Sequence, residues 1–545
     1  MKGDDLSPSR PIRSVWIATR EYAGIAEAGG VKNVACSLAE SLARKGVSVT
    51  VFIPRYGFVE SAGMLLFSTD VAVAGETHRV CFYSLSARGV RIILVDAHVF
   101  AEKRAVYVYT ETDEKVIPGA KRGKGHMDVD LVNMLFQRSV LAFALASETV
   151  PEVLHCQDAH TAILPALARN DSAYARLFER TATVVTVHNA GPGYRQAIPG
   201  LERAARMTGL PEIALARALF NGNVEPFLLA AEYGALTTVS PWYANELTDP
   251  AFDRFSEGIS GELRRRRIEV TGITNGIDFH RYDPRDTALS LLPYPYDPIE
   301  GEFSGKYRCR EEFARWLASD EAVPGIVKYG RLSACADSVY FSYHGRIAWQ
   351  KGLDVLEKAA RSTLDTLPGA RFVVLGQGDP ALEALFVMLS QRYEGRVAYI
   401  SGYERNLARL AVAISDFIVL PSAFEPCGLE DFIAQIFGTI PVAHAVGGLR
   451  KIEDGISGFL YGSADDDNDS LELARLLVDL GKPVSELGVR AGEDRARYGA
   501  GCAAVEEYRR IISYAATRVR DISNWDAIAE ASYIPLYRKI VDAMA

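Results

Sequence analysis

The sequence predicts an α/β protein built from two Rossmann-like, doubly wound domains that face a cleft. Short apolar segments alternate with amphipathic helical patterns in both halves of the 545-residue chain. A stretch rich in proline, tyrosine and charge, residues 284–336, lies between the halves and is interpreted as an interdomain connection. We therefore expect an N-terminal domain over residues 1–283 and a C-terminal domain over residues 337–515.

The first half opens with a β-α-β unit. An apolar strand, Val15–Thr19, precedes a loop that contains Gly29 and Gly30. Apolar residues at helical spacing then indicate a helix over residues 31–46, and Val47–Ile53 forms the next strand. A glycine-containing first turn is typical of a doubly wound sheet.

Further buried strands are expected wherever short apolar runs recur. They are Val184–Val187 and Leu236–Val239 in the first half, and Val339–Tyr343, Phe372–Leu375, Val397–Ile400 and Phe417–Leu420 in the second. Ligands of such sheets bind at the carboxyl ends of the strands. Since the informative loops of both halves follow strand ends, we expect one site in the cleft between the domains.

Composition excludes several classes of partner. The net charge of −9 and the pI near 5.7 argue against nucleic acid and against an anionic membrane surface. No apolar run reaches the ~18 residues that span a bilayer, and the N-terminus lacks the apolar core of a secretory signal. Seven dispersed cysteines without a CxxC pair suit reduced thiols in a cytoplasmic protein. The acidic stretch 465–469 is interpreted as a solvated loop, so no metal site is expected.

Two cations follow the first strand of the second half. Arg346, with Gly345 before it, lies where the chain leaves this strand, and Lys351 lies five residues after the arginine. Cations so spaced suit a diphosphate, whose negative charge they would stabilise as a nucleotide leaves. The alternative for each is an ordinary surface side chain. Tyr403 follows another strand of this half and could stack on a base, although exposed aromatic residues are common.

The hexapeptide FEPCGL, residues 424–429, links an apolar strand to a helical pattern. Backbone amides at such a turn, Gly428 and Leu429 among them, suit an anionic phosphate. Glu425, just before them, could hold a sugar or ribose hydroxyl. Taken alone, the same sequence also fits a strand-to-helix turn with no ligand.

The order of these motifs resembles the family of bacterial glycogen synthases and plant starch synthases. The matching segments of the second half are GRIAWQKGLD (345–354), LGQGDP (375–380), GYE (402–404), PSAFEPCGL (421–429) and VGGL (446–449). Those of the first half are HCQDAH (155–160), TVHN (186–189), TVSP (238–241) and GITNGID (272–278). The resemblance extends over nearly the whole chain.

The resemblance implies the two-domain GT-B fold and retaining transfer of glucose from ADP-glucose, possibly UDP-glucose, to the end of an α-1,4-glucan such as glycogen or a maltooligosaccharide. It also implies that the segment 516–545 returns to the first domain, which would hold the acceptor, while the second binds the nucleotide sugar. The implied catalytic residues are His188, Arg346, Lys351 and Glu425. The implied substrate-binding residues are Gly29, Gly30, Asp158, Asn275, Tyr403, Cys427, Gly428 and Leu429.

The resemblance further implies a front-face displacement that needs no cofactor and no metal ion, because Arg346 and Lys351 take the place of a cation. Many retaining transferases of this fold carry a second glutamate eight residues after the first. Ile433 stands at that position here. That difference favours the glycogen and starch synthase branch over the sucrose- and mannosyl-transferase branch.

The chain departs from the family where a diphosphate would bind. Glu27 replaces a lysine of the first glycine turn, and Glu430 and Asp431 replace Thr-Gln after FEPCGL. Glu27 either faces the phosphates or pairs with Lys32 or an arginine, and we favour pairing. Glu430 and Asp431 would repel a diphosphate, or would only complement a helix dipole.

Three functions remain open from the sequence. The first is an active α-1,4-glucan synthase, which the retained cations, His188 and Glu425 favour. The second is a retaining transferase with another nucleotide-sugar donor or acceptor. The third is a non-catalytic glucan-binding relative with a decayed donor site, which the three new acids favour. The donor base, acceptor length and oligomeric state are not fixed by the sequence.

Overall fold

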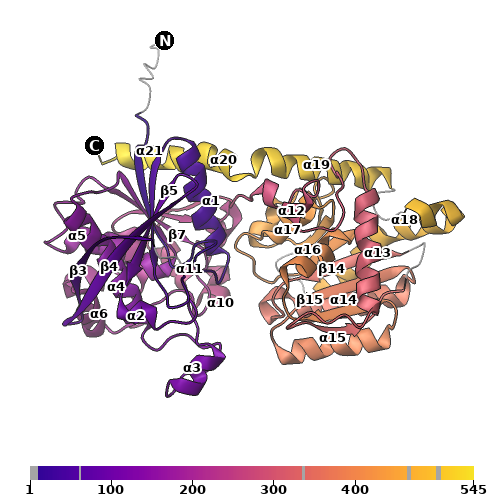
Figure 1. The fold of residues 1–545 in the computed structure, drawn as a ribbon, viewed down its shortest axis with the longest axis horizontal. Coiled ribbons are helices and arrows are strands. Elements are labelled where there is room, and N and C mark those ends of the chain that lie inside the picture. The colour runs from indigo at the N-terminus through magenta and orange to yellow at the C-terminus, as the bar shows by residue number, and fades with distance from the viewer. Residues whose placement is uncertain (1–9, 61–62, 334–337, 463–467, 499–504, 545) are drawn as a thin grey trace, which may run out of the picture. The chain divides into compact units, whose positions relative to one another are not determined.

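A computed structural model describes residues 10–60, 63–333, 338–462, 468–498 and 505–544. The chain divides into two compact units, residues 1–276 with 525–545 and residues 277–524. Each unit has its own main sheet (Figure 1). The α/β class with two Rossmann-like sheets is confirmed, while the expected cleft between the units stays a prediction. Most of the acidic stretch 465–469 lies outside the described residues.

The first unit is built on a nine-stranded sheet. Its order is β12-β11-β7-β6-β1-β2-β5-β4-β3, parallel except where β4 pairs antiparallel with β5 and with β3. The strands are β1 (Ser14–Ala18), β2 (Ser48–Pro54), β3 (Met64–Val73), β4 (Glu76–Ala87), β5 (Val90–Asp96), β6 (Val153–Gln157), β7 (Ala182–Val187), β11 (Ala235–Thr238) and β12 (Val270–Gly272). A small antiparallel sheet contains β8 (Ile198–Pro199), β10 (Asn223–Val224) and β9 (Leu219–Phe220).

Helices cover both faces of this sheet, because alternate strand residues point to opposite sides. Val15 and Ile17 of β1 pack with α1, while Trp16 packs with Phe143 of α4. The helices are α1 (Val31–Arg44), α2 (His98–Ala101), α3 (Glu111–Val116), α4 (Val129–Ser147), α5 (Leu164–Asn170), α6 (Leu201–Thr208), α7 (Glu212–Ala216), α8 (Pro226–Ala231), α9 (Pro241–Glu246), α10 (Asp253–Ser256), α11 (Ile259–Arg265), α20 (Trp525–Ile528) and α21 (Ile534–Asp542).

Helix α4 is the one described helix that is long and apolar enough to cross a membrane. Its most apolar stretch is 67% buried, and the helix packs against β3. Its apolar composition is therefore that of a core helix.

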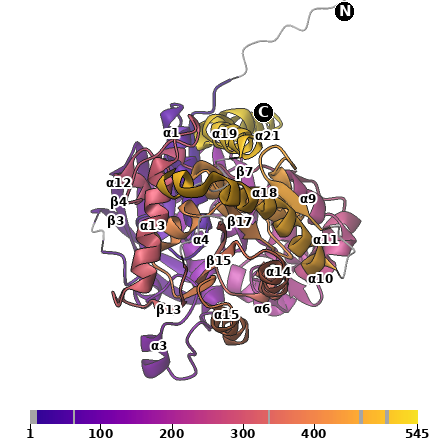
Figure 2. The ribbon, with the colours of Figure 1, turned by 90° about the vertical axis from the view of Figure 1, so that its right-hand side faces the viewer.

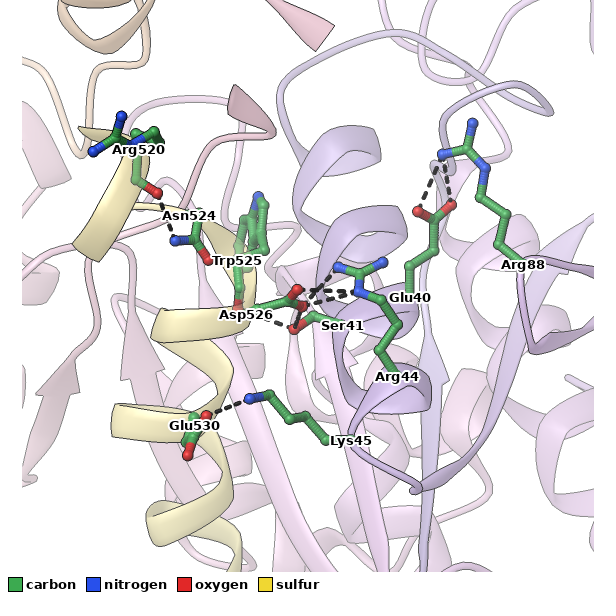
Figure 3. Close-up of polar contacts among 10 residues, drawn as sticks. All are labelled: Glu40, Ser41, Arg44, Lys45, Arg88, Arg520, Asn524, Trp525, Asp526 and Glu530. Carbon is green, nitrogen blue, oxygen red and sulfur yellow. Dashed lines mark hydrogen bonds and ion pairs between the residues drawn. The ribbon is translucent and has the colours of Figure 1, made fainter. Parts of the chain in front are cut away.

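The end of the chain is anchored in the first unit. Figure 3 shows Ser41 and Arg44 of α1 bound to Asp526, with the Arg44 Nη2 to Asp526 Oδ1 distance at 2.7 Å. Deeper in the unit, the Tyr537 hydroxyl is hydrogen-bonded to Nδ1 of His155 in β6 at 2.8 Å. Burial lowers the pKa of His155 to about 3, so its imidazole is neutral. The helical segment from Trp525 is thus part of this unit.

The second unit is built on a seven-stranded sheet of order β13-β16-β15-β14-β17-β18-β19. Only β13 is antiparallel to its neighbour. The strands are β13 (Val327–Gly330), β14 (Val339–His344), β15 (Ala370–Gly376), β16 (Val397–Ser401), β17 (Phe417–Leu420), β18 (Ile440–His444) and β19 (Phe459–Tyr461). The strands predicted in both halves are confirmed to within about two residues at each end.

Two apolar clusters lie on the two faces of this sheet. One joins Phe341 and Phe372 to α14, α15 and α18, and the other joins Tyr340 and Val373 to α13, α16 and α17. Figure 2 brings α14 and α18, which pack on each other, to the front. The helices are α12 (Thr287–Ser290), α13 (Ser304–Ala318), α14 (Leu353–Thr366), α15 (Pro380–Arg392), α16 (Arg405–Ala413), α17 (Glu430–Ile436), α18 (Asp469–Tyr498) and α19 (Glu506–Ile522).

The segment 284–336 is not a connection, contrary to the prediction, since it belongs to the second unit. Helix α13 buries Cys309, Phe313 and Leu317, which are four residues apart and share one face, and β13 extends the sheet. The second unit also begins earlier than expected, at Ile277, and continues through α19 to Asn524.

Candidate functional site

Two loops of the second unit meet at the carboxyl ends of β14 and β17. These strands are parallel neighbours, so their following loops leave the same edge of the sheet. A Cβ atom at Gly352 would lie 1.9 Å from the carbonyl oxygen of Pro421, and only glycine permits this approach. The close approach brings the short 3-10 helix Trp349–Lys351 beside the loop that carries Glu425.

Lys351 and Glu425 form an ion pair with each other. The hydroxyl of Ser422 also donates to the Glu425 carboxylate, at 3.1 Å. Burial by itself would raise the pKa of Glu425, but the Lys351 ammonium outweighs it and the pKa is lowered. Glu425 is therefore a carboxylate. Sequence reasoning gave these two residues separate contacts with a ligand, whereas the structure brings them together.

Arg346 and Tyr403 are exposed at the same edge of the sheet. The Arg346 guanidinium has no hydrogen-bond or ion-pair partner among the described residues, while its backbone carbonyl accepts from the Tyr343 hydroxyl at 2.8 Å. Tyr403 is 62% exposed, and its ring lies 6.2 Å from the His344 ring at an interplanar angle of 27°. A free guanidinium and an exposed ring are thus available to an anion and a planar base.

Both acids that follow FEPCGL are paired. Glu430 accepts from Nδ1 of His344 at 3.0 Å, and the buried Asp431 lies 2.9 Å from the ammonium of Lys451. Burial lowers the pKa of His344, but the charge and hydrogen bond of Glu430 outweigh it, and the net pKa is raised. The two acids expected to repel a diphosphate are therefore each held by a basic side chain of the same unit. Sequence reasoning missed His344 and Lys451, since each is distant in sequence from its partner.

The remaining residues of the FEPCGL loop adopt a compact turn. Cys427 is buried, and Gly428 has φ of 72°, in the left-handed region that favours glycine. Within the described residues, the Gly428 and Leu429 amides donate to no acceptor. Both amides are therefore free to bind an added anion.

The first unit brings His188 and Asp158 together at the ends of β6 and β7, which are parallel neighbours. Nε2 of His188 is 2.8 Å from Oε1 of Gln157, and the His188 amide donates to Asp158 at 3.4 Å. Burial lowers the pKa of His188 to about 4. Burial raises the pKa of Asp158 to about 7, against three backbone amides that lower it. A neutral imidazole and a carboxyl that titrates near neutrality thus share this edge.

Buried polar atoms at this edge lack partners among the described residues. They are Nε2 of Gln157, Nδ1 of His160 and Oδ1 of Asn275. Leaving such groups unpaired costs free energy, and a hydroxyl-rich ligand would satisfy them. Gln157 and His160 were not singled out from the sequence, although they flank Asp158 in the same motif.

The glycine turn of the first unit is organised by Glu21, which sequence reasoning missed. Its carboxylate accepts from the amides of Ala28 and Gly29, and a Cβ atom at Gly29 would lie 3.3 Å from it. No such contact constrains Gly30. The position of Glu21, three residues after β1, was the available signal.

Glu27 is paired with Lys32. Its Oε2 lies 2.7 Å from Nζ of Lys32, and its Oε1 accepts from the Gly24 amide at 2.8 Å. The favoured interpretation, that Glu27 pairs locally, is confirmed. No group of three histidine, cysteine, aspartate or glutamate side chains converges as a metal site within the part of the chain that the structure describes.

The two sheets and the strand-end loops define a glycosyltransferase of the GT-B class. The starch synthase catalytic domain matches residues 14–265, and glycosyl transferases group 1 match residues 338–480. A glycogen synthase of Anaeromyxobacter dehalogenans is 30% identical over 81% of this chain and 86% of its own length. A glycogen synthase of Exiguobacterium sibiricum is 28% identical over 80% of this chain and 84% of its own length. The chain belongs to the glycogen and starch synthase family.

Solved structures support the fold. The catalytic domain of starch synthase IV from Arabidopsis thaliana, bound to ADP and acarbose, superposes with a TM-score of 0.74 at 22% identity, over 98% of this chain and all of that one. Sucrose-phosphate synthase from Thermosynechococcus elongatus gives a TM-score of 0.54 at 16% identity, over 97% of this chain and all of that one.

Proposed function

We propose that this protein is an α-1,4-glucan synthase that transfers glucose from ADP-glucose to the non-reducing end of glycogen or a maltooligosaccharide, with retention at the anomeric carbon. The observation that carries the proposal is the meeting of Lys351, Glu425 and the FEPCGL loop at one sheet edge. Its curated relatives are glycogen synthases, and the similar starch synthase IV structure holds ADP.

The second unit supplies the donor site of this proposal. Arg346 and Lys351 bind the diphosphate, with the Gly428 and Leu429 amides, and Tyr403 stacks on the base. In the free chain the Lys351 ammonium is neutralised by Glu425. A diphosphate that draws Lys351 toward itself leaves the Glu425 carboxylate to accept hydrogen bonds from donor hydroxyls. Lys351 then binds the diphosphate of the donor, and Glu425 binds its hydroxyl groups.

The first unit supplies groups for the sugars. His188 contacts the transferring glucose, and Asp158 and Asn275 accept from sugar hydroxyls. The unpartnered atoms of Gln157, His160 and Asn275 support this assignment, since glucose presents both donors and acceptors. Gly29 and Gly30 complete the proposed substrate-binding set of this unit, because a turn built from glycines carries no side chain that would crowd a substrate.

The proposed reaction is a front-face displacement. The bond between the anomeric carbon and the diphosphate oxygen breaks, and the acceptor hydroxyl forms the new bond from the same face. The departing phosphate takes the acceptor proton, and Arg346 and Lys351 stabilise its charge. This mechanism needs no metal ion.

The two other functions that the sequence left open have less support. A non-catalytic relative was favoured by three acids that would repel a diphosphate. Each of those acids is paired with a basic side chain of its own unit, Lys32, His344 or Lys451. Tyr403 would stack on any base, so the assay compares donors that carry different bases.

The test is nucleotide release. We expect ADP to be released from ADP-glucose only when glycogen or a maltooligosaccharide is present, with little UDP from UDP-glucose. Analysis of the first product should show an α-linkage. If only another sugar nucleotide released its nucleotide, that compound would replace ADP-glucose as the proposed donor. If no sugar nucleotide released its nucleotide, the proposed enzymatic activity would be refuted. Loss of activity with EDTA, restored by Mg²⁺ or Mn²⁺, would refute the metal-independent mechanism.

A further inference from the structure

A buried lysine lies directly behind the FEPCGL loop. Lys451, at the end of the 3-10 helix Gly447–Lys451, is 4% exposed. Its ammonium donates to the carbonyl oxygens of Cys427 at 2.6 Å, Gly428 at 2.9 Å and Gly448 at 3.2 Å. Asp431 lies 2.9 Å away and neutralises the charge. One cation thus gathers three carbonyls from two segments of backbone.

The close fit of these segments depends on Gly448. A Cβ atom there would lie 2.2 Å from the carbonyl oxygen of Cys427 and 2.3 Å from its Cα atom. Real side chains do not tolerate such distances, so glycine is what lets the 3-10 helix lie against the loop. The position of Lys451 behind the loop is therefore built into the backbone of both segments.

The geometry of a trans peptide gives this contact a consequence on the other side of the loop. In a trans peptide group the C=O and N–H bonds point in opposite directions, and the described chain contains no cis peptide. The Cys427 carbonyl shares its peptide group with the Gly428 amide, and the Gly428 carbonyl shares its group with the Leu429 amide. Because Lys451 holds both carbonyls, both amides point away from it.

Neither of these two amides has a hydrogen-bond acceptor within the described residues. A buried ammonium and carboxylate carry a desolvation cost that apolar residues would avoid. Hydrogen bonds from Lys451 to the backbone carbonyls offset part of this cost. The main structural effect of the Lys451–Asp431 pair is therefore to fix the direction of the peptide groups that contain the Gly428 and Leu429 amides.

We propose that Lys451, neutralised by Asp431, is a positioning residue of the donor site. It aims the Gly428 and Leu429 amides outward, where they receive the donor diphosphate. This role rests on the proposed function, since it presupposes a nucleotide diphosphate at this loop. Lys451 itself does not touch the donor.

The test compares two buried lysines of the same unit. Lys306 is 1% exposed, and its ammonium also binds carbonyls, those of Ala413 and Phe437, together with Thr439. These partners lie before β17 and β18, at the opposite end of the strands from the FEPCGL loop. Lys306→Met is therefore a control for the loss of a buried lysine, and Lys451→Met removes the same chemistry behind the loop.

Calorimetry measures the affinity for ADP directly and the affinity for adenosine by its competition with ADP. We expect Lys451→Met to lose about tenfold or more in ADP affinity, the effect of misplacing hydrogen bonds to a charged group, with adenosine affinity within twofold of wild type. Lys306→Met should keep both affinities. The double variant Lys451→Met/Asp431→Asn removes the uncompensated carboxylate, and should regain thermal stability without regaining ADP affinity.

Two results would overturn the positioning role while leaving the proposed function in place. One is ADP affinity in Lys451→Met within threefold of wild type. The other is an equal loss of ADP and adenosine, which would indicate general damage to the loop. Wild type that binds neither ADP nor UDP would instead overturn the proposed function, and with it the donor role of Lys451.

Discussion

The replacement of Glu27 by lysine tests the most conspicuous departure from the family. In the structure, Glu27 is already engaged by Lys32 and by the Gly24 amide. The two side chains of the ion pair are 34% and 24% exposed, so the pair contributes about 0–1 kcal/mol to stability. Glu27→Lys restores the residue type of the family but removes both contacts.

The expected result is a modest loss of stability with little change in donor binding. The lost ion pair, the lost acceptor for Gly24 and the new repulsion between residue 27 and Lys32 sum to about 1–2 kcal/mol. Each kcal/mol lowers the thermal midpoint of a unit of this size by about 2–4 °C. ADP-glucose affinity, measured by calorimetry, should stay within about threefold of wild type. Differential scanning calorimetry measures the stability change.

Glu27→Gln serves as the matched control, because it keeps an acceptor for the Gly24 amide and removes only the charge. It should lose less stability than Glu27→Lys and leave donor affinity unchanged. A gain in ADP-glucose affinity of about tenfold or more in Glu27→Lys, about 1.4 kcal/mol, would refute the reasoning. It would mean that Glu27 weakens the donor site despite its pairing with Lys32.

Three further predictions concern other contacts. Lys351→Ala should reduce turnover by about 10²-fold or more in steady-state assays, since it removes a cation that stabilises the leaving diphosphate, and unchanged turnover would refute that role. Glu430 raises the pKa of His344 above its ordinary value of 6.5. The positive charge on His344, which offsets the Glu430 carboxylate, is therefore present at low pH and is lost as pH rises through the raised pKa. ADP affinity should therefore fall over this range in wild type, and a His344→Gln variant that keeps the same pH dependence would contradict the assignment. Tyr537→Phe should cost the first unit about 1–3 kcal/mol by leaving a ring nitrogen of buried His155 unpaired, and an unchanged thermal midpoint would contradict it.

The sequence could predict the fold because its signals are local. Apolar runs such as Phe417–Leu420 and Val339–Tyr343, followed by glycine-containing turns, indicate buried parallel strands without knowledge of their neighbours. The expectation that Lys351 and Glu425 lie at one edge follows from the same rule, since loops after parallel strands leave the sheet together. The misassigned segment 284–336 also contained a local signal, the four-residue spacing of apolar positions in α13, which its proline-rich composition obscured.

Only the tertiary structure decided how the charges are paired. Lys351 and Glu425 are 74 residues apart, and Glu430 and His344 are 86 apart. Coulombic interaction depends on distances of a few ångströms, which are set by strand order and by the close approach of backbones, and a sequence does not contain either quantity directly. Sequence reasoning therefore identified the acids beside the proposed diphosphate site but could not determine that His344 and Lys451 offset them.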